Sequence, residues 1–335
     1  MSGRLNPNRG LDTVLAWVDD HIASGPGSRS RAWRAAVVLL APAALILGLF
    51  GIAPIFATLG FSFYDLRYGQ GAFAAAANYQ EALSSRVFWN SVAVTLYYLA
   101  GVVPTTIVLG FVIAWGLMTI TRGRALFRTF YFLPYITSAY AAALVWRALL
   151  NPQAGLANSI LAHLGLPAQQ WLMEPRGLLH VLTGGAIPAD WGPSLALCCV
   201  MLFDIWHGLG FVVVILLAGL SSIPRELEEA ARIDGAGVVQ VLRHVTLPLL
   251  TPTLYFLLLV GTIKGFQAFN SFYALTAGGG NTLGTTENLV IHLFVNFYDN
   301  GRWGYGAAVA TLLLIAIIAL TLVQGRVARR WVHYE

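Results

Sequence analysis

Six long apolar runs constrain this chain more than any other feature, because each is long enough to cross a lipid bilayer. A membrane-spanning helix needs about 20 mostly apolar residues. The runs cover residues 35–61, 92–119, 132–150, 195–217, 253–276 and 305–323. They predict an all-α integral membrane protein with six spans.

Composition supports a lipid environment and argues against a nucleic-acid partner. Only 10% of the 335 residues are charged and 57% are hydrophobic, whereas a soluble domain usually carries about 25% charged residues. The net charge of +5 comes from arginines at the ends of the apolar runs. This placement is typical of membrane topology rather than of a basic patch that binds nucleic acid.

The arginine distribution predicts which flanks face the cytoplasm, where positive residues are enriched. One side carries Arg4, Arg9, Arg29, Arg31, Arg34, Arg122, Arg124, Arg128, Arg225, Arg232, Arg243, Arg326, Arg329 and Arg330. The other side carries fewer, namely Arg67, Arg86, Arg176 and Arg302, with Arg147 at a boundary. We therefore expect both termini to lie in the cytoplasm.

The chain is expected to have three regions. Residues 1–34 combine an expected amphipathic helix at 11–22 with a flexible linker at 24–30, although a disordered tail is the alternative. No secretory cleavage pattern follows, so the first apolar run is expected to be a permanent span. Residues 35–330 form the expected transmembrane domain, and residues 331–335 form a short cytoplasmic tail.

The loop between the fourth and fifth runs, residues 220–252, is expected to fold. A proline and several acidic residues at its start favour the first turn of a helix. Gly235 should end this helix, and a second short helix should cover residues 236–244. A Leu-Pro pair at 247–248 and a Thr-Pro pair at 251–252 should then turn the chain back into the bilayer. Such a helix–turn–helix suits docking on another protein.

The same loop resembles a family motif. Its three blocks are Glu-Ala-Ala at 229–231, a glycine at 235 and Val-Thr-Leu-Pro at 245–248. They resemble the EAA loop of ABC-importer permeases, which prefers isoleucine at the position of Val245. In that family the loop is a coupling helix that sits in a cleft of the ATPase subunit. The resemblance implies an ATPase-coupling role for Glu229, Ala230, Ala231, Asp234, Gly235, Leu247 and Pro248.

Shorter motifs extend the resemblance over most of the chain, at residues 61–65, 78–79, 132–134, 206–211, 275–280 and 331–335. Together they resemble the first of the two permease subunits in bacterial maltose- and glycerol-3-phosphate-type importers. The resemblance implies a six-span type I permease with a cytoplasmic coupling helix, located in the bacterial inner membrane. The implied partners are a second homologous permease, two ATP-binding cassette subunits and an extracytoplasmic solute-binding protein.

Catalysis is not expected of this chain itself. It has no GxxxxGK[ST] phosphate-binding loop, no nucleophile–base constellation and no metal-ligand spacing, and Cys198 and Cys199 are interpreted as packing residues. ATP and magnesium would therefore bind to the partner subunits. Residues 177–193 fall outside the resemblance and look like an insertion. This segment is expected to contact the solute-binding protein or cap the outer mouth, and the alternative is a mobile loop.

Polar residues inside the apolar runs are candidates for a solute path, because they are costly in a bilayer. The candidates combine charged and amide groups with aromatic rings, which suits a sugar: Asp204, Trp206, Lys264, Gln267, Phe269 and Asn270. Lys264 is the only lysine and is expected near mid-bilayer. It could pair with Asp204, attract an anionic group such as phosphate, or extend to an interface.

These features favour an ATP-driven importer of a disaccharide, an oligosaccharide or a glycerol phosphate. An ion-coupled secondary transporter is the alternative. That class would show inverted repeats and discontinuous helices, and no internal repeat is visible in the sequence. The sequence does not name the solute, the ATPase or the binding protein.

Overall fold

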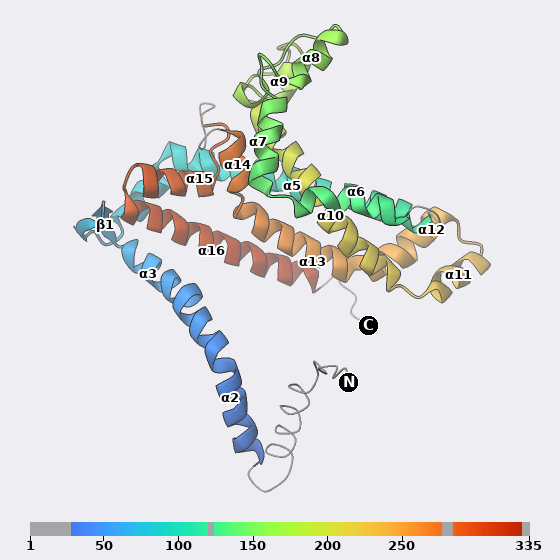
Figure 1. Cartoon of the computed structure of the whole chain (residues 1–335), viewed down its shortest axis with the longest axis horizontal. Coiled ribbons are helices and arrows are strands. Elements are labelled where there is room, and N and C mark those ends of the chain that lie inside the picture. Colours follow the sequence, from blue (N-terminus) through green and yellow to red (C-terminus); the bar gives the residue numbers. More distant parts are fainter. Residues whose placement is uncertain (1–27, 120–123, 277–283, 330–335) are drawn as a thin grey trace, which may run out of the picture. The chain divides into compact units, whose positions relative to one another are not determined.

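The structure is a computed structural model that describes residues 28–119, 124–276 and 284–329 (Figure 1). The helix expected at 11–22 and the tail expected at 331–335 lie outside the described residues. The chain divides into two compact units, Met1–Gly60 and Phe61–Glu335. The organisation into three regions stays a prediction.

One long helical segment forms the described part of the first unit. α2 (Ser28–Ile46) continues through a π-helical turn, η1 (Leu47–Ile52), into α3 (Ala53–Phe61). Pro54 follows this turn, and its ring and missing N–H would disturb a regular helix. A π turn is one way in which a helix accommodates such a residue. Ala36–Phe61 has 26 residues and is apolar enough to cross a membrane, which suits the first expected span.

Three helices of the second unit coincide with expected spans. They are α5 (Arg86–Thr119), α10 (Leu195–Ser221) and α16 (Trp303–Ala328). With Ala36–Phe61 and Val238–Phe266, they make up the five helices in the described parts of the chain that are long and apolar enough to cross a membrane.

The core of the second unit follows α10. Phe203 is fully buried in one apolar cluster, and Leu216 is fully buried in another that includes Leu250 of the following long helix. A Cβ added at Gly210 would lie 2.1 Å from the carbonyl oxygen of Tyr131. Glycine therefore lets α10 lie directly against a neighbouring backbone, as small residues do in membrane helix packing.

The region expected to form the third span, 132–150, contains two helices, so the prediction of a single helix is wrong. α6 (Arg124–Ile136) ends near Thr137, and α7 (Ala139–Leu149) begins after Ser138 and takes a different direction (Figure 1). The N–H and hydroxyl of Thr137 both donate to the Pro134 carbonyl, and Ser138 has an extended ψ of 120°. These local bonds end the helix where the apolar pattern continues.

The fifth span differs from the prediction at both ends. α12 (Val238–Val241) continues through a π turn, η3 (Leu242–Thr246), into α13 (Leu247–Phe266). The prediction of a turn at the Leu-Pro and Thr-Pro pairs is therefore wrong. The π turn precedes the first proline. The hydroxyl of Thr251 donates to the carbonyl of Pro248 at 2.7 Å. It replaces the helical bond to this carbonyl that Pro252 cannot form, because proline has no N–H.

The C-terminal end of α13 is a break rather than a continuation. The helix stops at Phe266, and a separate short helix, α14 (Asn270–Leu275), follows it. Lys264 therefore lies in the last turn of α13, not in the middle of an uninterrupted span. A cation there is favourable for the helix dipole.

A small β-hairpin was not part of the all-α prediction. β1 (Tyr64–Arg67) pairs with β2 (Gln70–Phe73) in antiparallel register. Tyr68 and Gly69 have φ values of 51° and 82°, as a two-residue type I′ turn requires. The N–H of Tyr68 donates to the carbonyl of Gly301 at 2.9 Å, which ties the hairpin to the start of α16.

The remaining described elements are short. They are α4 (Ala77–Ser84), α8 (Leu156–His163), η2 (Trp171–Met173), α9 (Leu178–Leu182), α11 (Arg225–Ile233), α15 (Leu289–Phe294) and η4 (Val295–Asp299).

Candidate functional site

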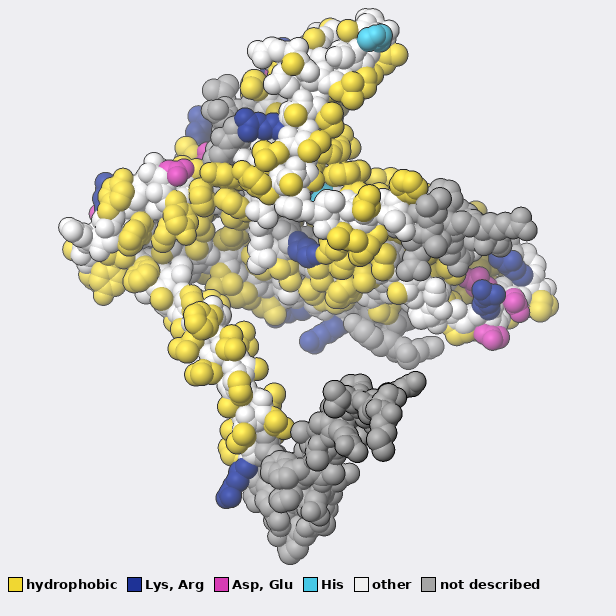
Figure 2. Space-filling view, in the orientation of Figure 1, with side chains coloured by type: hydrophobic (Ala, Val, Ile, Leu, Met, Phe, Trp, Pro, Cys, Tyr) yellow, Lys and Arg dark blue, Asp and Glu magenta, His cyan; other side chains and the backbone are white. Residues whose placement is uncertain are grey.

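The loop expected to couple to an ATPase forms an exposed acidic helix followed by a short second helix. α11 carries Glu226 and Glu228 in its first turn, as predicted from the helix dipole. Acidic and arginine side chains gather at this end of the molecule in Figure 2. Glu229, Ala230, Asp234 and Gly235 are exposed, while Ala231, Leu247 and Pro248 are partly buried.

Gly235 ends α11 in the way the sequence predicts. Its φ is +85°, in the left-handed region that favours glycine. Its N–H donates to the carbonyl of Arg232 at 3.0 Å, and the N–H of Ala236 donates to the carbonyl of Ala231 at 2.9 Å. This pair of bonds is a Schellman motif, which satisfies carbonyls that the helix end leaves free.

The second half of the loop packs back on α11 and leaves a groove between them. The N–H of Gly237 donates to Oε1 of Gln240 at 2.7 Å, and the hydroxyl of Thr246 lies 3.4 Å from Oε1 of Glu228. The groove has a volume of about 370 Å³ and is lined by Ala231, Asp234, Gly235, Ala236, Gln240, Val241, His244 and Val245. Three of the predicted coupling residues, Ala231, Asp234 and Gly235, thus line a concave surface.

A second, larger cavity lies among the long helices, with a volume of about 440 Å³. Five of the six candidate solute-path residues line it, from α10, α13, α14 and the break between the last two: Asp204, Lys264, Gln267, Phe269 and Asn270. Trp206 is not among its lining residues. Its ring packs instead 5.4 Å from that of Trp146 and 6.0 Å from that of Phe203, measured between centroids.

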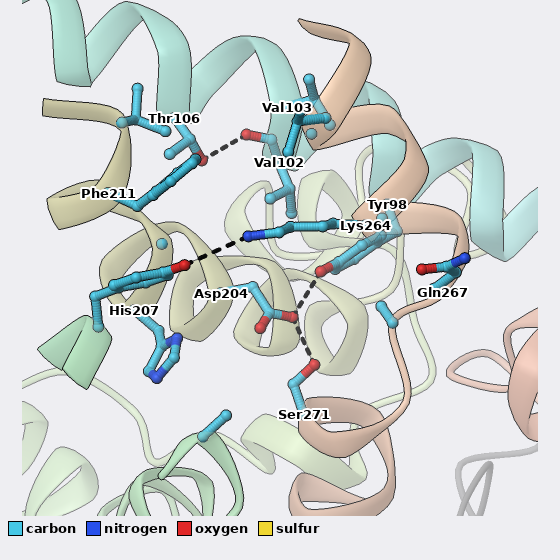
Figure 3. Close-up of a pocket in the computed structure, with 18 of the residues that line it drawn as sticks. Tyr98, Val102, Val103, Thr106, Asp204, His207, Phe211, Lys264, Gln267 and Ser271 are labelled. Carbon is cyan, nitrogen blue, oxygen red and sulfur yellow. Dashed lines mark hydrogen bonds between the residues drawn. The ribbon is translucent and has the colours of Figure 1, made fainter. Parts of the chain in front are cut away.

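Asp204 receives two hydrogen bonds in this cavity. The hydroxyl of Tyr98, from α5, donates to its Oδ2 at 2.8 Å, and the hydroxyl of Ser271, from α14, donates to the same oxygen at 2.7 Å. In Figure 3 the dashed lines from these two side chains meet at Asp204, which joins three helices. Hydrogen bonds of this kind are what a carboxylate needs when it is removed from water.

Lys264 does not form the ion pair with Asp204 that was one of its three expected roles. Its Nζ lies 4.6 Å from the centroid of the Phe211 ring and 5.6 Å from that of Tyr135. Tyr135 Oη is 3.5 Å from the same nitrogen, a long contact for a hydrogen bond. In Figure 3 the dashed line from Lys264 leads away from the Asp204 group. The Phe211 face therefore attracts the ammonium by a cation–π contact, and Tyr135 approaches it with its hydroxyl group rather than its ring face.

Two tyrosines that sequence reasoning did not select, Tyr98 and Tyr135, contact the predicted charged residues. The signal for both was a hydroxyl inside an apolar run, since a buried tyrosine hydroxyl usually needs a partner. His207, which also lines the cavity, has its Nε2 3.3 Å from the carbonyl oxygen of Thr137 at the end of α6. The break between α6 and α7 thus lies at the cavity wall, where Ala139 also lines it.

The 177–193 segment closes on itself. The N–H of Gly177 donates to the carbonyl of Ala189 at 2.7 Å, and the N–H of Leu178 donates to that of Pro193 at 3.0 Å. Trp191, the tryptophan of this segment, is 65% exposed. The backbone bonds rather than the tryptophan therefore hold the segment's ends together.

A buried carboxylate stands just before this segment. Glu174 is 4% exposed and accepts from Nε and Nη2 of Arg176 at 2.7 and 2.6 Å. This paired hydrogen bond lowers the pKa of the Glu174 carboxyl below its ordinary value. Among the described residues, no three histidine, cysteine, aspartate or glutamate side chains lie close enough to hold a metal ion.

Comparison with known proteins identifies the family. Residues 70–333 match the model of the "binding-protein-dependent transport system inner membrane component" family. The chain belongs to this family. It is therefore a multi-pass permease of the inner membrane that transports rather than catalyses, which confirms the predicted resemblance and disfavours the secondary transporter.

Curated relatives cover most of the chain. A trehalose/maltose transport system permease of Thermococcus litoralis is 30% identical over 294 residues, which is 87% of this chain and 92% of the relative. An arabinooligosaccharide transport system permease of Bacillus subtilis is 30% identical and covers 85% of both chains. An sn-glycerol-3-phosphate transport system permease of Agrobacterium fabrum is 29% identical, over 78% of this chain and 83% of the relative.

A solved structure supports the fold. A chain of a bacterial ABC transporter involved in the import of the acidic polysaccharide alginate matches with a TM-score of 0.72. The match covers 90% of this chain and 96% of that chain, at 20% sequence identity. At this identity the likeness concerns the fold, and it confirms the predicted type I permease architecture.

Proposed function

We propose that this chain is one of the two permease subunits of an ATP-driven importer for a sugar or sugar-like solute. The family is one of binding-protein-dependent transport, and the relatives named above serve maltose and trehalose, arabinooligosaccharides, and glycerol 3-phosphate. The solute would be a disaccharide, an oligosaccharide or a glycerol phosphate. A second homologous permease, two ATP-binding cassette subunits and an extracytoplasmic solute-binding protein would complete the importer.

The observation that carries the proposed mechanism is the exposed, Schellman-capped helix α11. Its acidic residues, such as the exposed Glu229, can pair with basic side chains of a partner protein. The small side chain of Ala230 allows the partner to approach the helix closely. α12 runs without a turn into α13, so a displacement of the loop would move the transmembrane helix that carries Lys264. ATP and magnesium would bind to the partner ATPases and no cofactor to this chain.

Alternating access follows from this linkage. Closure of the ATPases would shift α11, and the continuous α12–α13 rod would transmit the movement to the cavity that Asp204 and Lys264 line. Both termini would then lie in the cytoplasm with α11, in accordance with the arginine distribution. The 177–193 segment would lie on the opposite side, where a binding protein delivers solute.

The cavity has the properties of a sugar-binding stretch of the path. Its volume of about 440 Å³ lies in the usual range for small-molecule sites, about 300–1,000 Å³. Phe269 offers a ring for the apolar C–H face of a sugar, while Gln267 and Asn270 offer amides for its hydroxyls. Trp206 does not line this cavity, so its proposed role is to pack against Phe203 and hold α10 in place beside the cavity.

Transport in proteoliposomes tests this proposal. The chain would be reconstituted with its partner permease, ATPases and binding protein, and uptake of maltotriose and of glycerol 3-phosphate would be measured with ATP or with an ion gradient. We expect accumulation of at least one of these solutes with ATP alone. Accumulation driven by a proton or sodium gradient without ATP would contradict the proposal and favour a secondary transporter.

A further inference from the structure

The charges of the cavity are not balanced by one another. Its described lining contains one carboxylate, that of Asp204, and one ammonium, that of Lys264. The two groups form no ion pair, and no carboxylate of a described residue lies within 4.0 Å of the ammonium. Each charge must therefore be accounted for separately.

The carboxylate already has hydrogen-bond donors within the chain. Tyr98 and Ser271 both donate to Oδ2 of Asp204, and both are buried, at 4% and 5% exposure. The other oxygen, Oδ1, has no donor among the described residues and can accept a solute hydroxyl. Asp204 is thus oriented for a neutral hydroxyl group and does not require a cation.

Lys264 is exposed, and no described residue offers its ammonium an acceptor at normal hydrogen-bond distance. The Phe211 ring faces the ammonium with its centroid 4.6 Å away, and the Tyr135 hydroxyl oxygen lies 3.5 Å from it, nearer than the Tyr135 ring centroid at 5.6 Å. An ammonium has three N–H donors, and ring faces do not replace a strong acceptor. The C-terminal end of α13 makes a cation tolerable there, but the carbonyls of residues 263–265 already accept backbone N–H groups.

The amino end of α7 adds positive potential to the same cavity. α7 has 11 residues, and its N-cap residue, Ser138, makes no side-chain capping bond. Ala139, at its first turn, lines the cavity together with Lys264. A helix N-terminus favours negative charge, so this end reinforces the effect of the lysine.

We propose that Lys264 binds an anionic oxygen group of the solute, so that this importer carries an acidic sugar or a sugar phosphate. The group would be a carboxylate, sulfonate or phosphate, because these supply the charged acceptor that the ammonium lacks. Asp204 Oδ1 and the amides of Gln267 and Asn270 would bind the hydroxyls of the same solute. This proposal rests on the proposed function and specifies its solute class.

Direct binding to the assembled importer without its binding protein isolates the contribution of the permease. Four probes would be used in lipid nanodiscs: glycerol 3-phosphate and trigalacturonate as anions, and glycerol and maltotriose as their neutral counterparts. The variants are Lys264→Gln and Lys264→Arg. Arg147→Gln serves as a matched removal of positive charge, because Arg147 is exposed and outside the cavity lining.

We expect at least one anionic probe to bind more tightly than its neutral counterpart, and increasingly weakly as salt is raised. Lys264→Gln should weaken that binding by about tenfold to a hundredfold, the range for a lost hydrogen bond to a charged group. Lys264→Arg should retain most of it, and Arg147→Gln should leave it unchanged. Binding of the neutral probes should change less than threefold in every variant.

Several results would overturn the proposal. Binding of no anionic probe, equal binding of anionic and neutral probes, or unchanged affinity in Lys264→Gln would each do so. An equal loss for both probe classes, with poor recovery of the partner permease, would show instead that Lys264 pairs with a carboxylate of that subunit. ATP-driven uptake of maltotriose without any preference for anions would leave the proposed function intact while refuting this inference.

Discussion

Replacement of Gly235 tests the coupling loop through backbone conformation alone. Its φ of +85° is unfavourable for any residue with a Cβ, yet a Cβ added there would meet no atom within 4 Å. The cost is therefore conformational, about 1–2 kcal/mol, and should be nearly the same for alanine and leucine. That cost lowers the ratio of the Schellman-capped loop to its alternative conformations by about 5- to 30-fold.

The assay compares ATPase co-purification and transport for Gly235→Ala, Gly235→Leu and Gly116→Ala. Gly116 lies inside α5, where an added Cβ also meets no atom within 4 Å and alanine favours the helix, so this control should behave as the wild type. Both Gly235 variants should insert in the membrane normally and lose ATPase binding and transport to a similar degree. If Gly235→Ala is functional and Gly235→Leu is not, contact with the partner rather than the left-handed φ determines the effect. Normal coupling in both would refute the reasoning.

Three further predictions concern other parts of the chain. Tyr98→Phe and Ser271→Ala should each lower the free energy of unfolding by about 1–3 kcal/mol, measured by thermal unfolding in detergent. The effects should not add up in the double variant, because both hydroxyls donate to Asp204. Fully additive effects would argue against a shared network. Because the folded-state pKa of Glu174 is lowered, its ionised carboxylate should stabilise the folded protein fully above the ordinary glutamate pKa of about 4.3. This stabilisation should be lost as pH falls through the lowered folded pKa, and Glu174→Gln should remove this pH dependence. If Glu174→Gln leaves the pH dependence of stability unchanged, the pairing with Arg176 is contradicted. Deletion of residues 177–193 should reduce binding-protein-dependent uptake without unfolding the protein, because backbone bonds already join the ends of this segment. Unchanged docking and uptake would instead support the alternative that the segment is a mobile loop.

Much of the helical fold could be predicted because long apolar runs allow few alternatives in lipid. The runs that became α5, α10 and α16 were predicted within a few residues at one or both ends. The breaks in the third and fifth runs were not predicted, because Thr137, Ser138 and Gln267 interrupt the helices without interrupting the apolar pattern. Local hydrogen bonds and cavity contacts decide these breaks, and neither is visible in hydropathy.

The candidate site shows the same division between local and tertiary information. Gly235 could be predicted, since a motif glycine after an acidic helix is the usual sign of a left-handed helix end. The partners of Asp204 and Lys264 could not, because depth along two helices says nothing about rotation around their axes. The structure directs Asp204 to Tyr98 and Ser271 and turns Lys264 to aromatic rings instead.

ATP hydrolysis by the complex purified through this chain tests the central claim most directly. The tagged full-length chain would be purified in mild detergent together with its co-expressed partner subunits, and the ATPase rate would be measured with and without the solute-loaded binding protein. The account predicts an ATPase activity that elutes with this chain, rises when the loaded binding protein is added, and is lost in Gly235→Leu. A stable, folded chain that elutes without any ATPase activity, or an activity indifferent to Gly235→Leu, would contradict it.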